Sequence, residues 1–238
     1  NQPDNGTFEL YHNGRNFFPD SGVCTYYSTG GDNTLRYWFR GIDKHNTLSL
    51  GKQNIKKAEG KLLKSEEGAT ELVVFENQGY DNLKHRRAVF YVNKEFFVLV
   101  DEGIGSAEGT VNLSFNLCEG SSTEVVMDKE ENGAHTAFSN DNNIIVRTFA
   151  NKEITCSPFT GRIAYLVDGN YNDRQSYTID MNKESNETAR YITVIIPVKK
   201  STDINNISAH FTDNGYSENS VSIEVNVGGT IYPLSYTL

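Results

Sequence analysis

The sequence has few of the residues that cross-link small proteins or bind zinc. Its three cysteines, Cys24, Cys118 and Cys156, are odd in number and far apart, and no Cys-x-x-Cys pair occurs. This pattern indicates neither a disulfide framework nor a zinc ribbon. Because Cys24 and Cys118 lie within the apolar runs VCTYY and FNLC, we expect buried free thiols.

Positive charge is also scarce. The 22 Lys and Arg residues against 31 Asp and Glu residues give a formal net charge of -9. Such a balance repels polyanions at long range, so nucleic acid is not expected as a partner. An acidic ligand would need a local basic patch, or another domain, to attract it.

Long apolar segments are absent too. The sequence contains no signal peptide, lipidation motif or apolar run long enough to span a membrane. It begins with Asn1 rather than Met. We therefore expect a piece of a longer protein, with no membrane span in this part of it.

The sequence does contain many short apolar or alternating runs, separated by Gly, Asn and Asp. With 13 Tyr and 13 Phe against 2 Met, the composition favours strands over helices. The spacing predicts an all-β fold, a large two-layer antiparallel β-sandwich forming a single domain over residues 1–238. The clearest runs are Phe8–Tyr11, Asn16–Phe18, Leu35–Phe39, Asn46–Leu50, Leu72–Phe75, Ala88–Val92, Phe96–Val100, Val111–Leu117, Ile144–Phe149, Ile163–Val167, Tyr191–Val198, Val221–Val227 and Ile231–Leu234.

Turn residues support the same fold. Asn13-Gly14, Asn93-Lys94 and Gly228-Gly229 each separate two apolar runs, and such pairs suit the positive φ angles of a tight hairpin turn. The segment 52–68, KQNIKKAEGKLLKSEEG, contains helix-forming residues, but two glycines interrupt it and no apolar face persists. We predict a charged loop or a long connection between strands there.

Three segments carry a resemblance to a known family. The runs QPDNGTFELYHNGRNFFPDSG at 2–22 and GIDKHNTLSL at 41–50, with KHRRAVFYVNKEFFVLVDE at 84–102, resemble the heparinase II/III polysaccharide lyases, and heparinase III-type heparan-sulfate lyases most closely. The resemblance implies an N-terminal α/α-toroid that packs on a C-terminal β-sandwich, with the glycan in the groove between them. It also implies β-elimination, in which a base removes the C5 proton of a uronic acid.

The family's catalytic residues are expected outside this chain. The resemblance places a catalytic His just before Asn1, and an Asn and a Tyr in the toroid. It therefore implies that this chain holds none of the catalytic residues and is inactive alone. It also implies export, to the periplasm or outside the cell.

The same resemblance implies a divalent-metal site formed by Gln2, Asp20 and His45. Heparinase II-type members have His at the first position, so Gln2 departs from their pattern. One nitrogen and two oxygens favour calcium or manganese, with zinc still compatible. The structural alternative is that Asp20 caps the turn after Pro19 while His45 makes a hydrogen bond inside the sandwich.

Candidate substrate contacts are Asn1, Arg40 and Arg86. Arginine suits sulfate and carboxylate because its fork makes paired hydrogen bonds. Neighbours on a strand face opposite sides, so at most one of Arg86 and Arg87 reaches a given groove. Ordinary solvated charge is the alternative for both.

Together these features predict a partner and a function. The expected partner is heparan sulfate, an acidic glycan, held jointly with the absent α-helical domain. The alternatives are a lyase for another uronan such as alginate, a purely structural sandwich, and a non-catalytic glycan-binding module that uses exposed aromatics such as Tyr26, Tyr27, Tyr37 and Trp38. Sandwich cores also use aromatics, so their number does not separate these alternatives.

Overall fold

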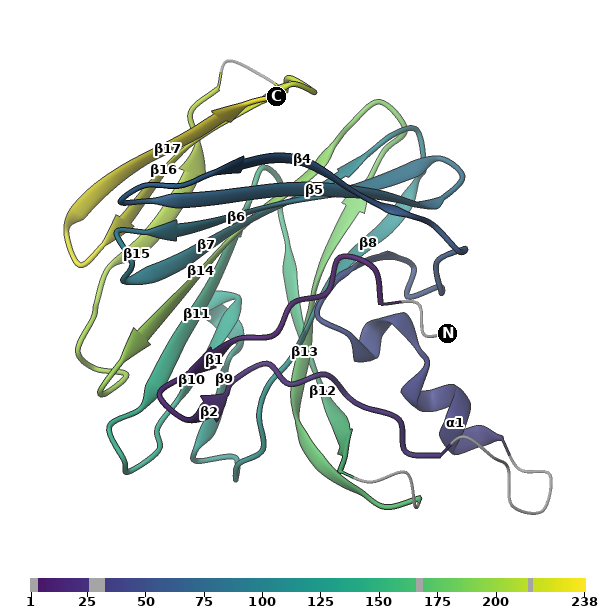
Figure 1. Ribbon diagram of the computed structural model, residues 1–238, viewed down its shortest axis with the longest axis vertical. Coiled ribbons are helices and arrows are strands. Elements are labelled where there is room, and N and C mark those ends of the chain that lie inside the picture. Colours follow the sequence, from purple (N-terminus) through teal and green to yellow (C-terminus); the bar gives the residue numbers. More distant parts are fainter. Residues whose placement is uncertain (1–3, 26–32, 166–168, 214–215) are drawn as a thin grey trace.

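The computed structural model describes residues 4–25, 33–165, 169–213 and 216–238, and it confirms the predicted antiparallel β-sandwich (Figure 1). The largest sheet has the strand order β4 (Gly60–Glu66), β5 (Glu71–Tyr80), β6 (Leu83–Val92), β7 (Phe96–Ile104), β14 (Ala189–Val198), β11 (Asn143–Ala150), β10 (Gly133–Thr136) and β9 (Val125–Asp128). We call it the central sheet.

Two smaller sheets and a hairpin complete the strands. The four-stranded sheet has the order β12 (Thr155–Ala164), β13 (Tyr171–Lys183), β8 (Gly109–Asn116) and β3 (Leu48–Leu50). The three-stranded sheet consists of β15 (Ile207–Phe211), β16 (Ser220–Val227) and β17 (Thr230–Thr237). The N-terminal hairpin pairs β1 (Tyr11–His12) with β2 (Arg15–Asn16).

The three predicted hairpin turns form where the sequence placed them. Asn93 and Lys94 have φ angles of 50° and 62° between β6 and β7, and Gly228 and Gly229 have 60° and 92° between β16 and β17. The Asn13-Gly14 turn joins β1 to β2 in the same left-handed region. Such angles match the twist of the flanking strands, so these short turns set the local register.

Two expectations about local structure were wrong. The run Leu35–Phe39 lies in a helix, α1 (Thr34–Phe39), in which Phe39 is the buried residue, because local hydrogen bonds such as Tyr37 N–H to the Asn33 carbonyl satisfy the backbone. A run of five residues is too short for its periodicity to distinguish a strand from a helical turn. Conversely, the charged segment 52–68 supplies β4 at the edge of the central sheet. Its lysines suit an edge strand, because exposed charges there discourage pairing with other chains.

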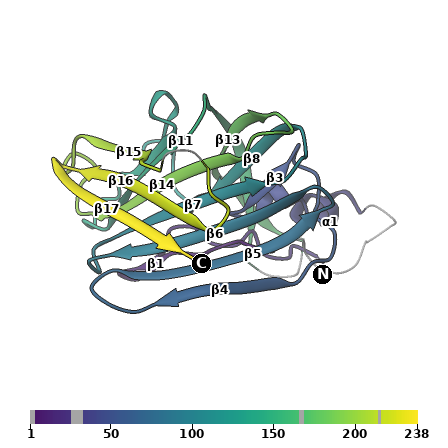
Figure 2. The same cartoon turned by 90° about the horizontal axis from the view of Figure 1, so that it is seen from above.

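The central sheet is covered on both faces, so the sandwich has a third layer that the two-layer prediction lacked. Leu99 and Ile195 face a core shared with the four-stranded sheet. Val98 and Ile192 face a second core shared with β16 and β17. Figures 1 and 2 show the three-stranded sheet on the side of the molecule away from α1.

The remaining features are short. Two 3-10 turns, η1 (Ile42–Lys44) and η2 (Lys129–Glu131), interrupt the strands. Cys24, Cys118 and Cys156 are buried free thiols, as expected. Among the described residues, no helix is long and apolar enough to cross a membrane.

Candidate functional site

The structure brings Asp20 and His45 together. His45 follows η1 and is completely buried, and Asp20 lies on the N-terminal segment that crosses the front of the molecule in Figure 1. His45 Nδ1 is 2.8 Å from Asp20 Oδ2, and Asp20 Oδ1 accepts a 2.7 Å hydrogen bond from the Gly22 N–H. These contacts match the alternative to a metal site, in which Asp20 caps the turn after Pro19 and His45 makes a hydrogen bond inside the sandwich.

The same pair also suits a shared cation. Neighbouring ligand atoms on one ion lie about 3 Å apart at the usual metal–ligand distances. Burial raises the pKa of Asp20, but the hydrogen bond and charge of His45 outweigh it, and the net pKa lies below its ordinary value. The carboxylate is therefore ionised, and His45 Nε2 is buried without a hydrogen-bond partner among the described residues.

Gln2, the third predicted ligand, and Asn1, a predicted substrate contact, lie outside the described residues. Within the described part, no group of three or more His, Cys, Asp or Glu side chains is placed to hold a metal. The donors present, one carboxylate and one imidazole, fit two positions of the predicted mixed set. The site therefore needs a ligand from beyond this pair.

A buried arginine holds the Asp20 segment in place. Arg174 on β13 donates to the Pro19 carbonyl and to Ser21 Oγ, both at 2.6 Å, and Ser21 Oγ donates to the Lys44 carbonyl at 2.6 Å. The segments before Asp20 and before His45 are thus tied to one strand. Burial lowers the pKa of Arg174 to about 10, because no carboxylate in direct contact offsets the loss of water. Sequence reasoning missed this residue, since nothing near Arg174 marks it as buried.

A second buried group fixes the N-terminal segment further upstream. Arg87 Nη1 donates to the Gly6 carbonyl at 2.6 Å and to the Asn46 carbonyl at 2.8 Å, while its Nε donates to Asp101 at 2.7 Å. His85 also contacts Asp101, at 2.6 Å. This group ties the residues just after Gln2 to the residue next to His45.

Arg86 faces away from Arg87, as strand alternation predicts. It is 4% exposed, and it pairs with Glu76 at 2.8 Å and donates to the Glu218 carbonyl. Because the Arg86 guanidinium already bonds to these groups inside the protein, its position does not support the predicted contact with substrate. Arg40 follows α1 and is partly exposed, close in sequence to the Asp20–His45 pair.

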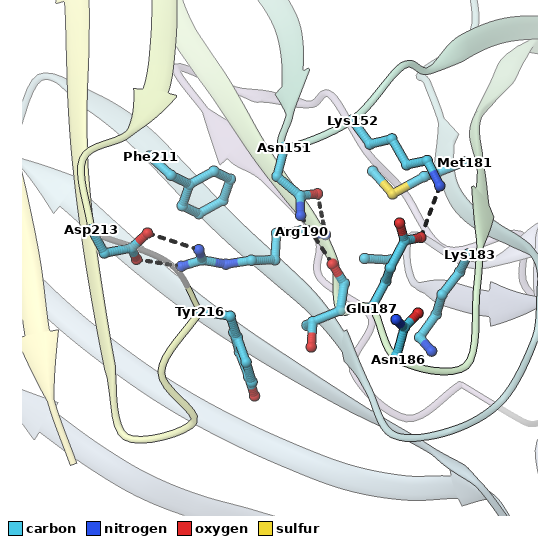
Figure 3. Close-up of a pocket in the computed structure, with 12 residues that line it drawn as sticks. Asn151, Lys152, Met181, Lys183, Asn186, Glu187, Arg190, Phe211, Asp213 and Tyr216 are labelled. Atoms are coloured by element: carbon cyan, nitrogen blue, oxygen red, sulfur yellow. Dashed lines mark hydrogen bonds and ion pairs between the residues drawn. The ribbon is translucent and has the colours of Figure 1, made fainter.

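Other hollows lie away from the Asp20–His45 pair. A pocket of about 490 Å³ opens between the β13–β14 hairpin and the end of β15, and its lining includes neither Asp20 nor His45. Figure 3 shows its charged side chains turned toward each other, with Arg190 paired to Asp213 at 2.7 Å and Lys152 to Glu187 at 2.8 Å. The Lys183 ammonium in the same pocket donates to backbone carbonyls, among them those of Gly105 and Ala107. These charged groups are therefore already bonded within the protein.

Comparison with known families identifies the class of this sandwich. The family described as heparinase II/III-like, C-terminal, matches residues 1–210, and the chain belongs to it. Its curated relatives include a heparin-sulfate lyase of Bacteroides thetaiotaomicron, 83% identical over all 238 residues, and one of Bacteroides stercoris, 37% identical over 238 residues. The chain spans 34% and 35% of their lengths, about a third of each.

Solved structures agree with this assignment. A crystal structure of heparinase III matches the whole chain with a TM-score of 0.98 at 83% identity, over 36% of its own length. The heparan sulfate lyase of Pedobacter heparinus matches the whole chain with a TM-score of 0.88 at 26% identity, over 37% of its length. The three-layered sandwich is therefore the fold of the matching third of these proteins.

Proposed function

We propose that this chain is the C-terminal β-sandwich of a heparan-sulfate lyase, where it forms one wall of the substrate cleft. The observation that carries the proposal is the 83% identity, over the whole chain, to a heparin-sulfate lyase three times as long. The proposed reaction is β-elimination, with the base that removes the C5 proton outside the described residues. The complete protein is proposed to be periplasmic or secreted.

The proposed role of this chain is to bind and orient rather than to transfer protons. Arg174 and Arg87 anchor the N-terminal segment at Pro19 and Gly6, and catalysis depends on such positioning, since misplacement by about 1 Å can cost a hundredfold in rate. We propose that this anchored segment positions the catalytic His that the family resemblance places just before Asn1. The other wall would come from the α-helical domain that the family resemblance implies.

We also propose that Gln2, Asp20 and His45 hold a divalent cation, with calcium or manganese favoured and zinc compatible. A bound cation would supply positive charge beside the cleft and would hold the entrance segment in place. The close contact between Asp20 and His45 Nδ1 supports this proposal. Its main role would be structural, because an ion seated between two segments stabilises the arrangement that binds it.

Activity measurements on the complete protein test the lyase proposal. We expect it to release unsaturated uronate from heparan sulfate, followed by ultraviolet absorbance, and we expect the 238-residue chain alone to release none. Cleavage of alginate in place of heparan sulfate would reject the substrate. Tight glycan binding by the chain, with no cleavage by the complete protein, would favour a binding module.

Metal analysis of variants of the complete protein tests the cation site. We expect Asp20→Asn and His45→Gln each to lose the bound ion and to lower the melting temperature. An ion at about a hundred times its Kd stabilises by about 2.7 kcal/mol. The control is His210→Gln, which changes an exposed histidine on β15 and should keep the ion. An ion retained by the Asp20 and His45 variants, or absent from the wild type, would reject the site.

A further inference from the structure

The residues around Trp38 form a group of basic and aromatic side chains outside the Asp20–His45 pair. Arg162 on β12 lies 4.8 Å from the centre of the Trp38 ring and 4.5 Å from that of Tyr171. Lys44 Nζ lies 4.8 Å from the Trp38 ring and 4.9 Å from the Phe159 ring. We call Trp38, Lys44, Phe159, Arg162 and Tyr171 the basic–aromatic cluster. It joins α1 to the ends of β12 and β13 (Figure 1).

The Arg162 guanidinium is oriented but has unused hydrogen-bonding capacity. Its side chain is 32% exposed, and within the described part of the chain the nearest carboxylate is that of Asp173, at 3.9 Å, which is too long for a hydrogen bond. Aromatic rings attract a guanidinium and restrict its plane. The N–H groups that remain suit paired hydrogen bonds to a carboxylate or a sulfate.

Four other arginines on the strands differ from Arg162. Arg86, Arg87 and Arg190 each contact a carboxylate at 3.0 Å or less. Arg174 donates from its Nη1 and Nη2 atoms to carbonyl and hydroxyl oxygens instead. Those four are buried and bond inside the protein, whereas Arg162 is presented toward solvent.

The basic–aromatic cluster is continuous with the Asp20–His45 pair. The Lys44 carbonyl accepts the hydrogen bond from Ser21 Oγ, and His45 is the next residue. On the other side, the Ala164 N–H donates to the Ser21 carbonyl at 3.0 Å, and Ala164 lies two residues beyond Arg162 on β12. Through Ser21, the cluster therefore lies beside the Asp20–His45 pair, where the cleft is proposed.

The local charge is unusual for this protein. The chain carries a formal net charge of -9, which repels acidic polymers at long range. Around Trp38, however, Arg162 from β12 lies against the ring, and Lys44, which is paired with Asp43, contacts the ring as well. A polyanion would meet the Arg162 guanidinium here. This cluster is therefore a candidate for the local basic patch that an acidic ligand would need.

We infer that the basic–aromatic cluster is a binding subsite for an acidic sugar, with Arg162 as the residue that pairs with its carboxylate or sulfate group. The inference rests on the proposed lyase function and adds a specificity determinant outside the metal pair. The opposing explanation is that the cluster only pins α1 to β12 and β13.

Steady-state kinetics of the complete lyase on heparan sulfate test this inference. We expect Arg162→Gln to raise KM about ten- to hundredfold with kcat nearly unchanged, since hydrogen bonds to charged groups contribute that much to binding. Arg162→Lys should recover part of the loss, because it keeps the charge but not the fork. Trp38→Leu should raise KM by a smaller factor. Lys61→Gln, the same loss of charge on the exposed edge strand β4, is the control and should leave KM unchanged.

A second substrate identifies the anionic group. If Arg162→Gln raises KM equally for heparan sulfate and for its desulfated, N-acetylated form, the ligand is the uronate carboxylate. If KM rises for the sulfated polymer alone, the ligand is a sulfate. Both results support the subsite.

Other outcomes overturn it. An unchanged KM in a folded Arg162→Gln variant would reject the subsite while leaving the lyase proposal intact. If both Arg162→Gln and Arg162→Lys lower the melting temperature and weaken activity to the same extent, the cluster is structural. A wild-type protein that does not cleave heparan sulfate would reject the lyase proposal first.

Discussion

The central sheet carries one buried carboxyl group on each face, and the two are neighbours on β7. Asp101 faces the four-stranded sheet and the N-terminal segment, where Arg87 and His85 contact it at 2.7 Å and 2.6 Å. Glu102 faces the three-stranded sheet, where Arg190 contacts it at 3.0 Å. Their exposed fractions are 0% and 1%, so burial does not distinguish them.

Their pKa values nevertheless shift in opposite directions. Burial raises the pKa of both, but Arg87 and His85 reverse this at Asp101, and its pKa lies below the ordinary value. At Glu102 burial prevails, and its pKa lies above the ordinary value, although Arg190 lowers it, because Asp213 adds like charge and shares that arginine. Equal burial therefore goes with opposite pKa shifts, because the charged groups around the two carboxyls differ.

Removing the arginine on the Asp101 face should have the largest effect. We expect Arg87→Met to lower the free energy of unfolding by about 3–5 kcal/mol, because it leaves a buried carboxylate without its main partner. Urea denaturation of the chain measures this. Arg190→Met is the matched comparison and should cost less, because Glu102 can bind a proton and become neutral. Equal losses in the two variants would show that the two faces do not differ in this way.

The apolar parts of the two faces can be compared on β14. Ile192 lies in the core next to the three-stranded sheet, and Ile195 in the core next to the four-stranded sheet. We expect Ile192→Ala to cost about 2–5 kcal/mol, like other deletions in closed cores. Ile195→Ala should fall at the lower end, because Ile195 borders a hollow of about 110 Å³ into which neighbours can relax. Thermal denaturation measures both losses of unfolding free energy. A loss under about 1 kcal/mol for Ile192→Ala would mean that burial against the third layer contributes little to stability.

The pH dependence of stability gives the smallest and most specific test. Because the pKa of Glu102 is raised above 4.5 in the folded protein, its contribution to stability falls as the pH rises from there through the folded-state pKa. Asp101 has the opposite sign, since its contribution is present above its ordinary pKa and is lost as the pH falls through the lowered one. Glu102→Gln should therefore gain stability relative to wild type as the pH rises. Urea midpoints measured across the acid range check this, and parallel curves would contradict it.

Much of the fold could be predicted from local patterns. Asn13-Gly14, Asn93-Lys94 and Gly228-Gly229 form the expected turns, because positive φ angles depend on the residue itself and its immediate neighbours. The third layer had a usable signal as well. Tyr191–Ile196 is buried on both faces of β14, and such a continuous apolar run indicates a strand covered on both sides.

The candidate site was predictable only in part. Asp20 and His45 were found through their family motifs, and the structure places them in contact. Arg162 was not found, because 124 positions separate it from Trp38 (162 minus 38), and no spacing rule connects such distant residues.

The sequence by itself determined many of the strands, the three tight turns and the family, since each depends on residues close together along the chain. Only the tertiary structure decided which charges are neutralised. Arg86 and Arg87 are adjacent, yet one pairs with Glu76 and the other with Asp101 on the opposite face. It also decided that Trp38 and Arg162 meet. Charged residues that are far apart in the sequence become partners only when the sheets pack. That packing is fixed by the burial of both faces of the central sheet.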